Sequence, residues 1–288
     1  MKVLVTGAKG QLGQSMQKIA MQVLPSASFL WTDVDELDIT SLTAVEGFIA
    51  NHKPDYIINC AAYTAVDKAE SEPDKALLIN AEAPRLLASA SHRHGARLIH
   101  VSTDYVFNGR SNTPYSENHP PDPQGMYGFT KLQGELLVAE NAPQSLIIRT
   151  SWLYSEYGHN FVKTMLKLGS ERHEIGVVSD QYGSPTYAGD LARAILEFIR
   201  QGADVPGGIY HYCNQGITTW HGLATRVMEM AGLHCRVNAI TTAEYPTAAY
   251  RPGYSVLQTN RLQETLGITI PEWESSLQTC MNNITDLS

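Results

Sequence analysis

The feature that most constrains the fold is a glycine-spaced turn near the start of the chain. Residues 2–6 form an apolar run typical of a strand, and Gly7, Gly10 and Gly13 follow before a segment whose apolar residues have helical spacing. In a strand–turn–helix unit such glycines permit a tight turn, close approach of a pyrophosphate, and close packing of the helix on the strand. The pattern predicts a dinucleotide at a helix N-terminus, where free N–H groups and the helix dipole favour an anion.

The rest of the first half alternates strand and helix patterns. Apolar runs predict strands over residues 29–32, 56–60, 97–101 and 145–149. Helical patterns lie between them, over residues 13–24, 41–51, 73–94 and 126–140. Successive βαβ units of this kind predict an α/β fold with a Rossmann-type doubly wound parallel sheet.

The alternation weakens after residue 150, which divides the chain into two expected parts. We assign residues 1–150 to an NAD(P)-binding Rossmann domain and residues 151–288 mainly to a smaller C-terminal substrate-binding domain. Residues 208–213 again form an apolar run, so a segment of about residues 177–215 is expected to return to the Rossmann domain. Residues 107–125, rich in Pro, Gly, Asn and Ser, predict a long loop near the site.

Charge and composition narrow the class of function. The chain carries 21 Lys and Arg against 29 Asp and Glu, a net charge of -8, which argues against a nucleic-acid or acidic-membrane partner. The longest apolar runs are too short to span a bilayer, so we expect a cytoplasmic protein. The four cysteines lie far apart, which favours reduced thiols over a disulfide framework or a zinc site. Any phosphate must therefore be held by a local device such as the glycine turn.

Residues near the second predicted strand bear on the choice of cofactor. Asp33 follows that strand, 20 residues after Gly13, where an acidic side chain typically accepts hydrogen bonds from the adenosine ribose. This placement favours NADH over NADPH. Lys9 lies inside the turn and is placed to attract a 2′-phosphate, so NADPH stays open as well. Asp38 is either a helix N-cap competitor or a ligand of the adenine.

Three residues indicate a catalytic site. Tyr127 and Lys131 stand four residues apart at the start of a predicted helix, so their side chains share a face. An ammonium beside a phenol lowers the phenol pKa, which would make Tyr127 a usable proton donor. Thr103 follows the strand at residues 97–101 and should lie at the carboxyl edge of the sheet, where ligands bind in open α/β folds. Its hydroxyl would hold a substrate oxygen beside Tyr127.

Several motifs together resemble one family. The chain is similar to the dTDP-4-dehydrorhamnose reductases, a family of extended short-chain dehydrogenase/reductases, and the similarity runs from residue 3 to beyond Arg251. Besides the glycine turn, the motifs that carry it are residues 59–70 (NCAAYTAVDKAE), 102–107 (STDYVF), 127–131 (YGFTK), 149–154 (RTSWLY), 160–165 (NFVKTM) and 180–186 (DQYGSPT).

The resemblance implies reduction of the C4 ketone of dTDP-4-dehydro-6-deoxy-L-mannose to dTDP-L-rhamnose, with hydride from NADPH or NADH. Tyr127 would protonate the forming alkoxide, Lys131 would lower the phenol pKa and bind the nicotinamide ribose, and Thr103 would hydrogen-bond the reacting oxygen. The resemblance also implies cofactor contacts, namely Gly10, Gln11 and Leu12 at the pyrophosphate, Asp33 at the ribose, Asp38 and Ile39 at the adenine, Ala62, Tyr63 and Thr64 along the cofactor, and Val101 beneath the nicotinamide.

For the substrate, the resemblance implies contacts from Asp104 and Trp152. Trp152 is alternatively a core aromatic. Arg251 is placed either to reach the substrate diphosphate or to form a surface salt bridge. Asn80 matches an asparagine that steadies the active-site helix or a water in related enzymes, and is alternatively an ordinary polar residue within a helix.

One position departs from the pattern of the family. Asn108 replaces the aspartate common in the family after Tyr-Val-Phe, which removes a charge at the mouth of the loop.

Certain members of the family form a homodimer that holds Mg²⁺ through C-terminal glutamates. Here the available residues, Glu264, Glu272 and Glu274, lack the spacing of a metal site and favour surface roles. The expected partners are therefore the dTDP-sugar substrate and, in some relatives, a second copy of the chain.

Other functions remain open from the sequence alone. The fold and several motifs are shared by the non-catalytic NADP-binding regulatory subunit of methionine adenosyltransferase. Related enzymes also include epimerases, dehydratases and reductases of other nucleotide-linked 4-keto sugars. A binding module needs only the glycine turn, so the joint presence of Thr103, Tyr127 and Lys131 favours a catalyst.

Overall fold

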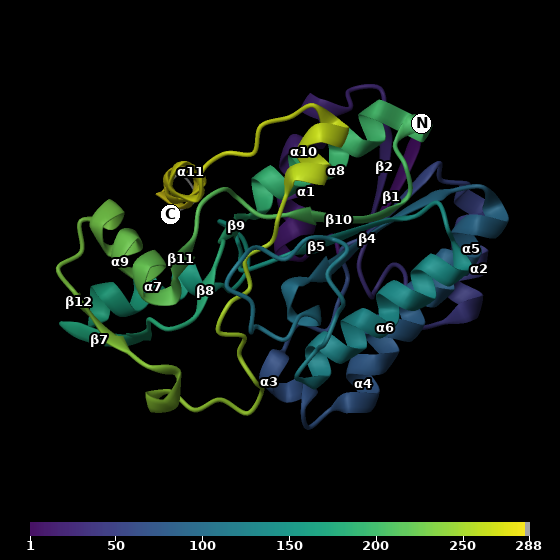
Figure 1. The fold of residues 1–288 in the computed structure, drawn as a ribbon. Helices are drawn as coiled ribbons and strands as arrows, with labels where there is room; N and C mark the ends of the chain where they lie inside the picture. The colour runs from purple at the N-terminus through teal and green to yellow at the C-terminus, as the bar shows by residue number, and fades with distance from the viewer. Residues whose placement is uncertain (286–288) are drawn as a thin grey trace.

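The computed structural model describes residues 1–285 and contains a six-stranded parallel sheet. The strand order is β10-β5-β4-β3-β1-β2, and Figure 1 shows the sheet with helices packed around it. The strands are β1 (Lys2–Thr6), β2 (Ser28–Thr32), β3 (Tyr56–Asn59), β4 (Arg97–Thr103), β5 (Leu146–Thr150) and β10 (Gly208–Tyr212). The sheet is therefore of the doubly wound Rossmann type that the sequence predicts.

Helices cover both faces of this sheet. One face carries α1 (Gln11–Val23), α8 (Ala188–Gln201) and α10 (Asn260–Leu266). The other carries α2 (Leu42–His52), α5 (Ala83–His94) and α6 (Met126–Asn141). Strand β1 shows why both faces are apolar, since Val3 and Val5 join the first core and Leu4 joins the second.

The strand order reverses direction at β1, which pairs with β2 on one side and with β3 on the other. Connections therefore leave the sheet in opposite directions at this point, and a crevice opens outside the carboxyl ends of the strands. The residues at those ends are Thr6, Thr32, Asn59 and Thr103. The fold thus places the glycine turn and Thr103 along one edge of the sheet.

The segment at residues 73–94, predicted as mostly helical, is helical throughout but irregular. It consists of α4 (Pro73–Leu77), a π-helical turn at Leu78–Glu82, and α5. A short helix α3 (Val66–Ala69) precedes it. The π-turn contains Asn80, whose side chain is fully buried. Turns of this type widen the helix and recur near functional sites.

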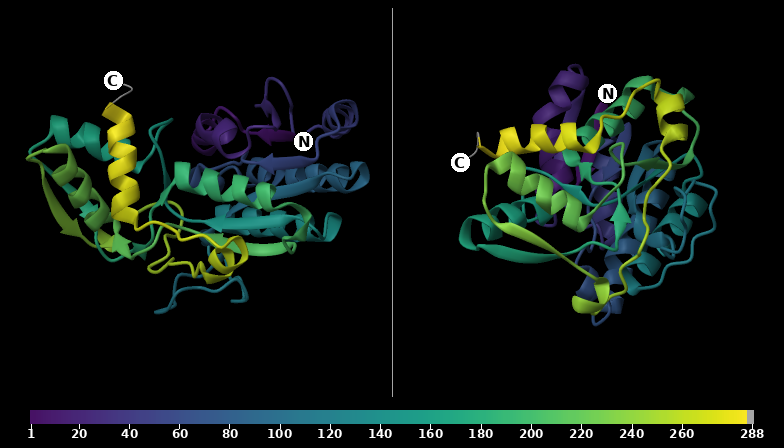
Figure 2. Two further views of the ribbon diagram at one scale, coloured as in Figure 1. Left: turned by 90° about the horizontal axis from the view of Figure 1, so that it is seen from above. Right: turned by 60° about the vertical axis from the view of Figure 1, so that its left-hand side comes forward.

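The remaining elements form a second layered part beside the sheet (Figure 2). Its helices α7 (Phe161–Glu171), α9 (Trp220–Ala231) and α11 (Trp273–Thr285) share a hydrophobic cluster. Its short strands pair two by two, namely β7 (Glu174–Val178) with β12 (Arg236–Ile240), β8 (Tyr182–Gly183) with β11 (Thr218–Thr219), and β6 (Leu153–Tyr154) with β9 (Thr186–Tyr187).

The chain crosses between the two parts more than once. After β9 it returns to the main sheet, where α8 packs against α1 and β10 pairs with β5. The strands β8 and β9, which also fall within residues 177–215, pair outside the main sheet. The expected division of the chain at residue 150 stays a prediction.

The loop at residues 107–125 is held at several points, among them a bridge between Tyr115 and Leu257 and a hydrogen bond from the main-chain N–H of Tyr254 to the Gly109 carbonyl oxygen. The short 3₁₀ turns lie at Asp104–Val106, Gly202–Asp204 and Thr242–Glu244. The cysteines at 60, 213, 235 and 280 are free thiols. None of the helices within residues 1–285 is long and apolar enough to cross a membrane.

Candidate active site

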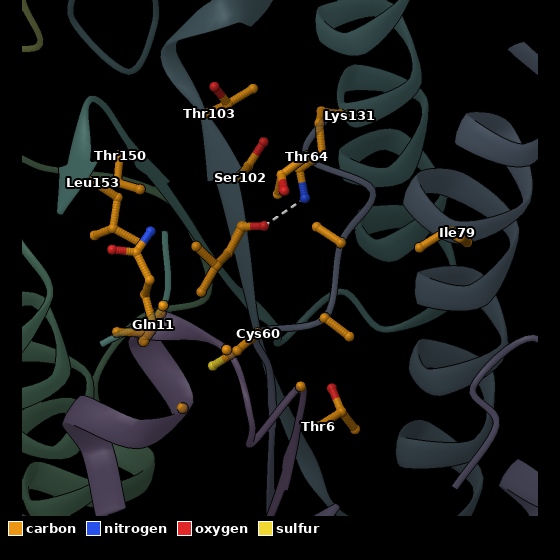
Figure 3. Close-up of a pocket in the computed structure, with 18 of the residues that line it drawn as sticks. Thr6, Gln11, Cys60, Thr64, Ile79, Ser102, Thr103, Lys131, Thr150 and Leu153 are labelled. Carbon is orange, nitrogen blue, oxygen red and sulfur yellow. Dashed lines mark hydrogen bonds between the residues drawn. The ribbon is translucent and has the colours of Figure 1, made fainter. Parts of the chain in front are cut away.

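A cavity of about 860 Å³ lies at the carboxyl edge of the sheet, between the two parts of the molecule. Its walls come from the glycine turn, the ends of β2, β3 and β4, the start of α6, and residues 150–153 and 158–160. Figure 3 shows side chains from these elements converging around it, with Thr103 and Lys131 near one another and Gln11 and Cys60 farther along.

The glycine turn fits an anion because main-chain atoms approach closely there. Gly7 has φ +66°, and a Cβ on it would lie 2.7 Å from the main-chain nitrogen of Ala61. A Cβ on Gly13 would lie 2.5 Å from the Gly7 carbonyl oxygen. Helix α1 begins directly after Gly10, which brings no side chain to compete for its first N–H groups. The turn therefore has the cradle that a pyrophosphate needs.

Gln11 joins this turn to the second part of the molecule. Its Oε1 accepts hydrogen bonds from Ser155 Oγ and from Asn160 Nδ2, each at 3.0 Å. Next to this contact, Lys18 of α1 pairs with the buried carboxylate of Glu156 at 3.1 Å. Movement of the loop that holds Ser155 and Asn160 is thereby coupled to the turn.

Carboxylates crowd the adenosine end predicted for the cavity. Asp33 Oδ2 accepts a hydrogen bond from the main-chain N–H of Lys9 at 3.0 Å. The Lys9 ammonium pairs with Asp35 at 2.7 Å and lies 3.5 Å from Glu36. The turn therefore holds one ammonium among three carboxylates, and two of them neutralise it already.

Asp38 and Ile39 both line the cavity next to this group. The side chain of Asp38 accepts hydrogen bonds from Thr40 N and Thr40 Oγ1, which lower the pKa of the Asp38 carboxyl. Asp38 thus organises its own turn and faces the cavity, whereas the N-cap of α2 is Ser41, whose hydroxyl accepts from the main-chain N–H of Ala44. The role of Asp38 at the adenine stays a prediction.

The phenol of Tyr127 and the hydroxyl of Thr103 meet in the cavity. A hydrogen bond with Thr103 acts to lower the pKa of Tyr127, but burial outweighs it and raises that pKa to about 12. Burial therefore sets the direction of the Tyr127 pKa shift in this structure, and a lowering by Lys131 stays a prediction. The Lys131 ammonium donates to the carbonyl oxygen of Val101 at 2.6 Å.

Lys131 itself is almost fully buried, and burial lowers the pKa of its ammonium to about 8. The Glu135 carboxylate, one helical turn further along α6, acts in the opposite direction. That carboxylate is already held by Arg149, with distances of 2.6 to 3.1 Å, and by Ser102 Oγ at 2.5 Å. The Glu135 carboxylate, the nearby counter-charge for Lys131, is therefore already paired with the Arg149 guanidinium.

Asp104 lies beside the catalytic candidates at the sheet edge and is 2% exposed. Its Oδ1 accepts from the Thr103 hydroxyl at 3.0 Å. Burial raises the pKa of Asp104 to about 6, and hydrogen bonds from Ser255 and Thr103 oppose the rise. The site therefore contains a carboxyl group whose charge is costly in the folded protein.

Trp152 forms a wall of the cavity with an unusual backbone. Its φ is +47°, in the left-handed region, where a bulky residue is strained. The indole stacks on Trp220 of α9, with ring centroids 3.7 Å apart and planes 9° apart. Gly183 packs on the ring as well, since a Cβ there would lie 2.5 Å from Trp152 Cε2. Two neighbours thus hold the strained residue in place.

The structure gathers most of the predicted residues in this one cavity. The predicted residues that line it are Gly7, Gly10, Gln11, Leu12, Gly13, Asp33, Asp38, Ile39, Ala62, Thr64, Val101, Thr103, Asp104, Tyr127, Lys131 and Trp152.

Two predicted residues stand apart from the cavity lining within residues 1–285. Tyr63 exchanges main-chain hydrogen bonds with the Asn80 side chain, and its hydroxyl donates to Glu72 at 3.1 Å. Arg251 pairs with Asp67 at 2.6 Å, which matches the salt-bridge alternative. Asn80 also donates to Thr130 Oγ1, the residue before Lys131. Asn80 therefore ties the π-turn to the active-site helix.

The C-terminal glutamates do not form a metal site in the described chain. Among residues 1–285, no three His, Cys, Asp or Glu side chains gather as metal ligands. Glu274 lies 3.7 Å from Arg226 in an exposed ion pair. The expectation of Mg²⁺ at a dimer contact gains no support.

Several cavity residues were missed by the sequence analysis. Thr6, Cys60, Ser102 and Thr150 lie at or next to strand ends, so the strand prediction contained the signal for them. Gly158, His159 and Asn160 come from a loop of the second part and had no such signal. Further lining residues that the sequence did not predict are Val34, Leu37, Thr40, Ala61, Val66, Ile79, Tyr105, Ser151 and Leu153.

Comparisons with known proteins add an independent finding. The family model described as RmlD substrate binding domain matches residues 1–286. A dTDP-4-dehydrorhamnose reductase of Aggregatibacter actinomycetemcomitans is 42% identical, over 96% of this chain and 97% of its own. A probable dTDP-4,6-dihydroxy-2-methyloxan-3-one 4-ketoreductase of Streptomyces antibioticus is 41% identical, over 99% and 96%.

A solved structure is similar along the whole chain. The dTDP-4-dehydrorhamnose reductase of Bacillus anthracis, crystallised in complex with NADP, has a TM-score of 0.93 and 41% identity. The match covers 98% of this chain and 99% of that one. The similarity therefore includes the cavity and both parts of the molecule that enclose it.

Proposed function

The chain belongs to the dTDP-4-dehydrorhamnose reductase family of NAD(P)H-dependent oxidoreductases, and from this premise we propose that it reduces dTDP-4-dehydro-6-deoxy-L-mannose to dTDP-L-rhamnose. The observation that carries the proposal is the joining, in one cavity, of an anion cradle at Gly7–Gly13 with Thr103, Tyr127 and Lys131. A dinucleotide seated on the turn would extend its reactive end toward these three side chains.

When bound, NADPH or NADH supplies the hydride that goes to C4 of the sugar. The phenol of Tyr127 supplies the proton to the oxygen at C4, and its raised pKa of about 12 keeps it protonated at neutral pH. The hydroxyl of Thr103, which donates to Asp104 in this structure, turns its hydrogen to the same oxygen and so favours the charge that develops there. Lys131 holds the nicotinamide ribose through its ammonium.

The remaining contacts follow the cavity from end to end. We assign Gly10, Gln11 and Leu12 to the pyrophosphate and Ala62 and Thr64 to the middle of the cofactor, with Tyr63 acting through its main chain. Val101 lies under the nicotinamide. Asp33, Asp38 and Ile39 take the adenosine.

The sugar nucleotide enters from the second part of the molecule. Trp152 packs against the hexose, and Asp104 accepts from its hydroxyls. Arg251 reaches the diphosphate only if it leaves Asp67, so its role in binding requires exchange of one anionic partner for another. Residues 1–150 with α8 and β10 serve the cofactor, and most of residues 151–288 serves the substrate. Homodimerisation and a cytoplasmic location stay predictions.

The cofactor preference follows from the charges at the adenosine end. A 2′-phosphate would meet Asp33 and a Lys9 ammonium that Asp35 and Glu36 already occupy. We therefore infer that NADH is used more efficiently than NADPH. We also infer that NADPH is accepted, since the Bacillus anthracis relative was crystallised with NADP.

The proposal is tested by the consumption of NADH and NADPH, followed at 340 nm, with dTDP-4-dehydro-6-deoxy-L-mannose. We expect turnover with wild type and a loss of about 10²- to 10⁴-fold in kcat for Tyr127→Phe, because the proton donor is removed. Cofactor binding should persist in that variant, which serves as the control for folding. Oxidation of neither cofactor would sink the reductase assignment and favour the regulatory-subunit alternative.

A second candidate rests on the Streptomyces antibioticus relative, whose name gives a different dTDP-linked keto sugar. A panel of nucleotide-linked 4-keto sugars compared by kcat/KM separates the two candidates. A higher value for a sugar other than dTDP-4-dehydro-6-deoxy-L-mannose would move the assignment within the family. Conversion of a sugar without net cofactor consumption would point to an epimerase or a dehydratase instead.

A further inference from the structure

A chain of buried polar groups reaches Lys131 from beneath the cavity. It begins at Asn59, the last residue of β3, whose Oδ1 accepts from the main-chain N–H of Ala61 at 3.2 Å and from Thr6 Oγ1 at 2.7 Å. A main-chain N–H can only donate, so this contact fixes which side of the amide carries the oxygen. The Asn59 NH₂ group must then point the other way, toward His100.

The orientation of Asn59 determines the tautomer of His100. Asn59 Nδ2 lies 3.0 Å from His100 Nδ1, and an amide NH₂ donates only, so Nδ1 is the acceptor. His100 has no exposed surface, and burial together with the Lys131 charge holds its pKa well below the ordinary value. A neutral ring with an accepting Nδ1 carries its hydrogen on Nε2.

That hydrogen faces the Lys131 ammonium. His100 Nε2 and Lys131 Nζ are 3.5 Å apart, while Nζ donates to the Val101 carbonyl at 2.6 Å. Two donors therefore face each other across a buried gap. The contact is unfavourable for an ammonium and favourable for a neutral amine, whose lone pair can accept from Nε2–H.

The other groups around Lys131 lie just after β3 and on α6. Cys60 follows β3, and Glu135 and Tyr127 lie on α6 with Lys131 itself. The Glu135 charge favours the ammonium, but it is shared with Arg149. The Cys60 thiol has a pKa raised to about 12 and stays neutral, as does the phenol of Tyr127. His100 is thus the group whose polarity opposes the charge on Lys131.

We propose that His100 is a positioning residue that presents Nε2–H to Lys131, so that the lysine is held at Val101 yet releases its proton readily. The function of this arrangement rests on the proposed reductase activity, in which Lys131 sits beside the proton donor. The arrangement itself is a property of the free protein and can be measured without substrate.

The first measurement is the tautomer of His100 in wild type, by long-range ¹H–¹⁵N NMR correlation. The His100 signals are assigned by their loss in His100→Gln. We expect a protonated Nε2 and an unprotonated Nδ1 at pH 7. A protonated Nδ1 would overturn the proposal outright, whatever the variants do.

The second measurement is the pKa of Lys131, read from the Cε shift of ¹³C-labelled lysine and assigned through Lys131→Met. His100→Met removes the facing donor, and we expect the pKa to rise from about 8 by on the order of one unit. His100→Gln is the matched control, because its amide can accept from Asn59 and still donate to Lys131. We expect its Lys131 pKa to stay close to wild type.

Asn59→Asp is expected to exchange the donor and acceptor nitrogens of His100 without changing His100 itself. A carboxylate at this position would take the hydrogen of Nδ1 and leave Nε2 as an acceptor for the ammonium, so we expect the pKa of Lys131 to rise here too. Equal Lys131 pKa values in folded wild type, His100→Met and Asn59→Asp would refute the proposal. Because the ammonium of Lys131 is proposed to bind the nicotinamide ribose, loss of activity at high pH should follow the Lys131 pKa. A Lys131 pKa that rises while the loss of activity stays at the same pH would contradict that role of Lys131 and leave the positioning role of His100 standing.

Discussion

The glycine turn and the Trp152 wall lie in the same cavity but are built in different ways. At the turn, the close contacts are between main-chain atoms, and Gly7 and Gly13 leave no room for a Cβ. At the wall, the strained backbone of Trp152 is held by the side chain of Trp220 and by a packed glycine. The comparison indicates that the proposed cofactor end is fixed by backbone geometry, whereas the proposed substrate end is fixed by the packing of side chains.

The largest effect is expected at the turn, from Gly13→Ala. The added Cβ would overlap the Gly7 carbonyl and Ala8, so the turn must open and the helix must move. We expect NADH affinity, measured by calorimetric titration, to fall on the order of 100-fold. Gly47→Ala on α2 is the matched control, since its Cβ would meet no atom within 4 Å among residues 1–285. An unchanged NADH affinity in Gly13→Ala would contradict the conclusion that backbone geometry fixes the cofactor end.

The next effect concerns stability at the substrate end, through Asp104→Asn. Burial raises the folded-state pKa of Asp104 from 3.8 to about 6, so the protonated form is favoured on folding. This contribution is fully present below pH 3.8 and is lost as pH rises through 6. We therefore expect Asp104→Asn to gain stability over wild type as pH increases, on the order of 1–3 kcal/mol by pH 7.

The measurement for Asp104 is urea unfolding of both proteins at pH 4, 5 and 7. The two free energies of unfolding should converge at the acid end. A difference that does not change with pH would show that the carboxyl is not protonated preferentially on folding.

A smaller effect is expected when the wall loses its support, in Trp220→Leu. Loss of the stacked partner should allow Trp152 to shift, and we expect KM for the dTDP-sugar to rise about tenfold, as befits one aromatic pair. KM for NADH should stay unchanged in this variant. Trp273→Leu, in the same hydrophobic cluster, is the control for general destabilisation. Equal changes in both variants would mean that Trp220 supports the fold and not the wall.

The smallest effect is expected from Asp33→Asn, at the exposed adenosine end. Removal of one carboxylate near Lys9 should raise the kcat/KM ratio of NADPH to NADH by roughly three- to tenfold at low salt, and less at high salt. Steady-state kinetics with both cofactors measures the ratio. A ratio insensitive to this change would show that the cofactor end, too, is set by the backbone alone.

The sequence predicted the sheet well because its signal is local. The strands that carry the turn and Thr103 are buried on both faces, so they appear as continuous apolar runs. Their ends then predicted where ligand residues gather. The same logic places Tyr127 and Lys131 on one helix near that edge.

What the sequence could not predict depends on contacts between distant segments. Gln11 meets Asn160, 149 residues away, and Trp152 meets Trp220 through the packing of a separate helix. The direction of the Lys131 ammonium could not be predicted for a similar reason. Spacing placed the ammonium and the phenol on one face, but the Val101 carbonyl, from another element, directs the ammonium elsewhere.

The π-turn at Leu78–Glu82 amounts to one residue more than a regular helix needs over the same length. Its surplus carries Asn80, which ties Tyr63 to Thr130, and its carbonyl packs directly against Gly134 of α6. Deleting a single residue here would restore regular α-helical winding and would remove the widened turn that places Asn80 between Tyr63 and Thr130. The fold therefore depends on the number of residues in this stretch, and we expect substitutions here to be tolerated more readily than a deletion.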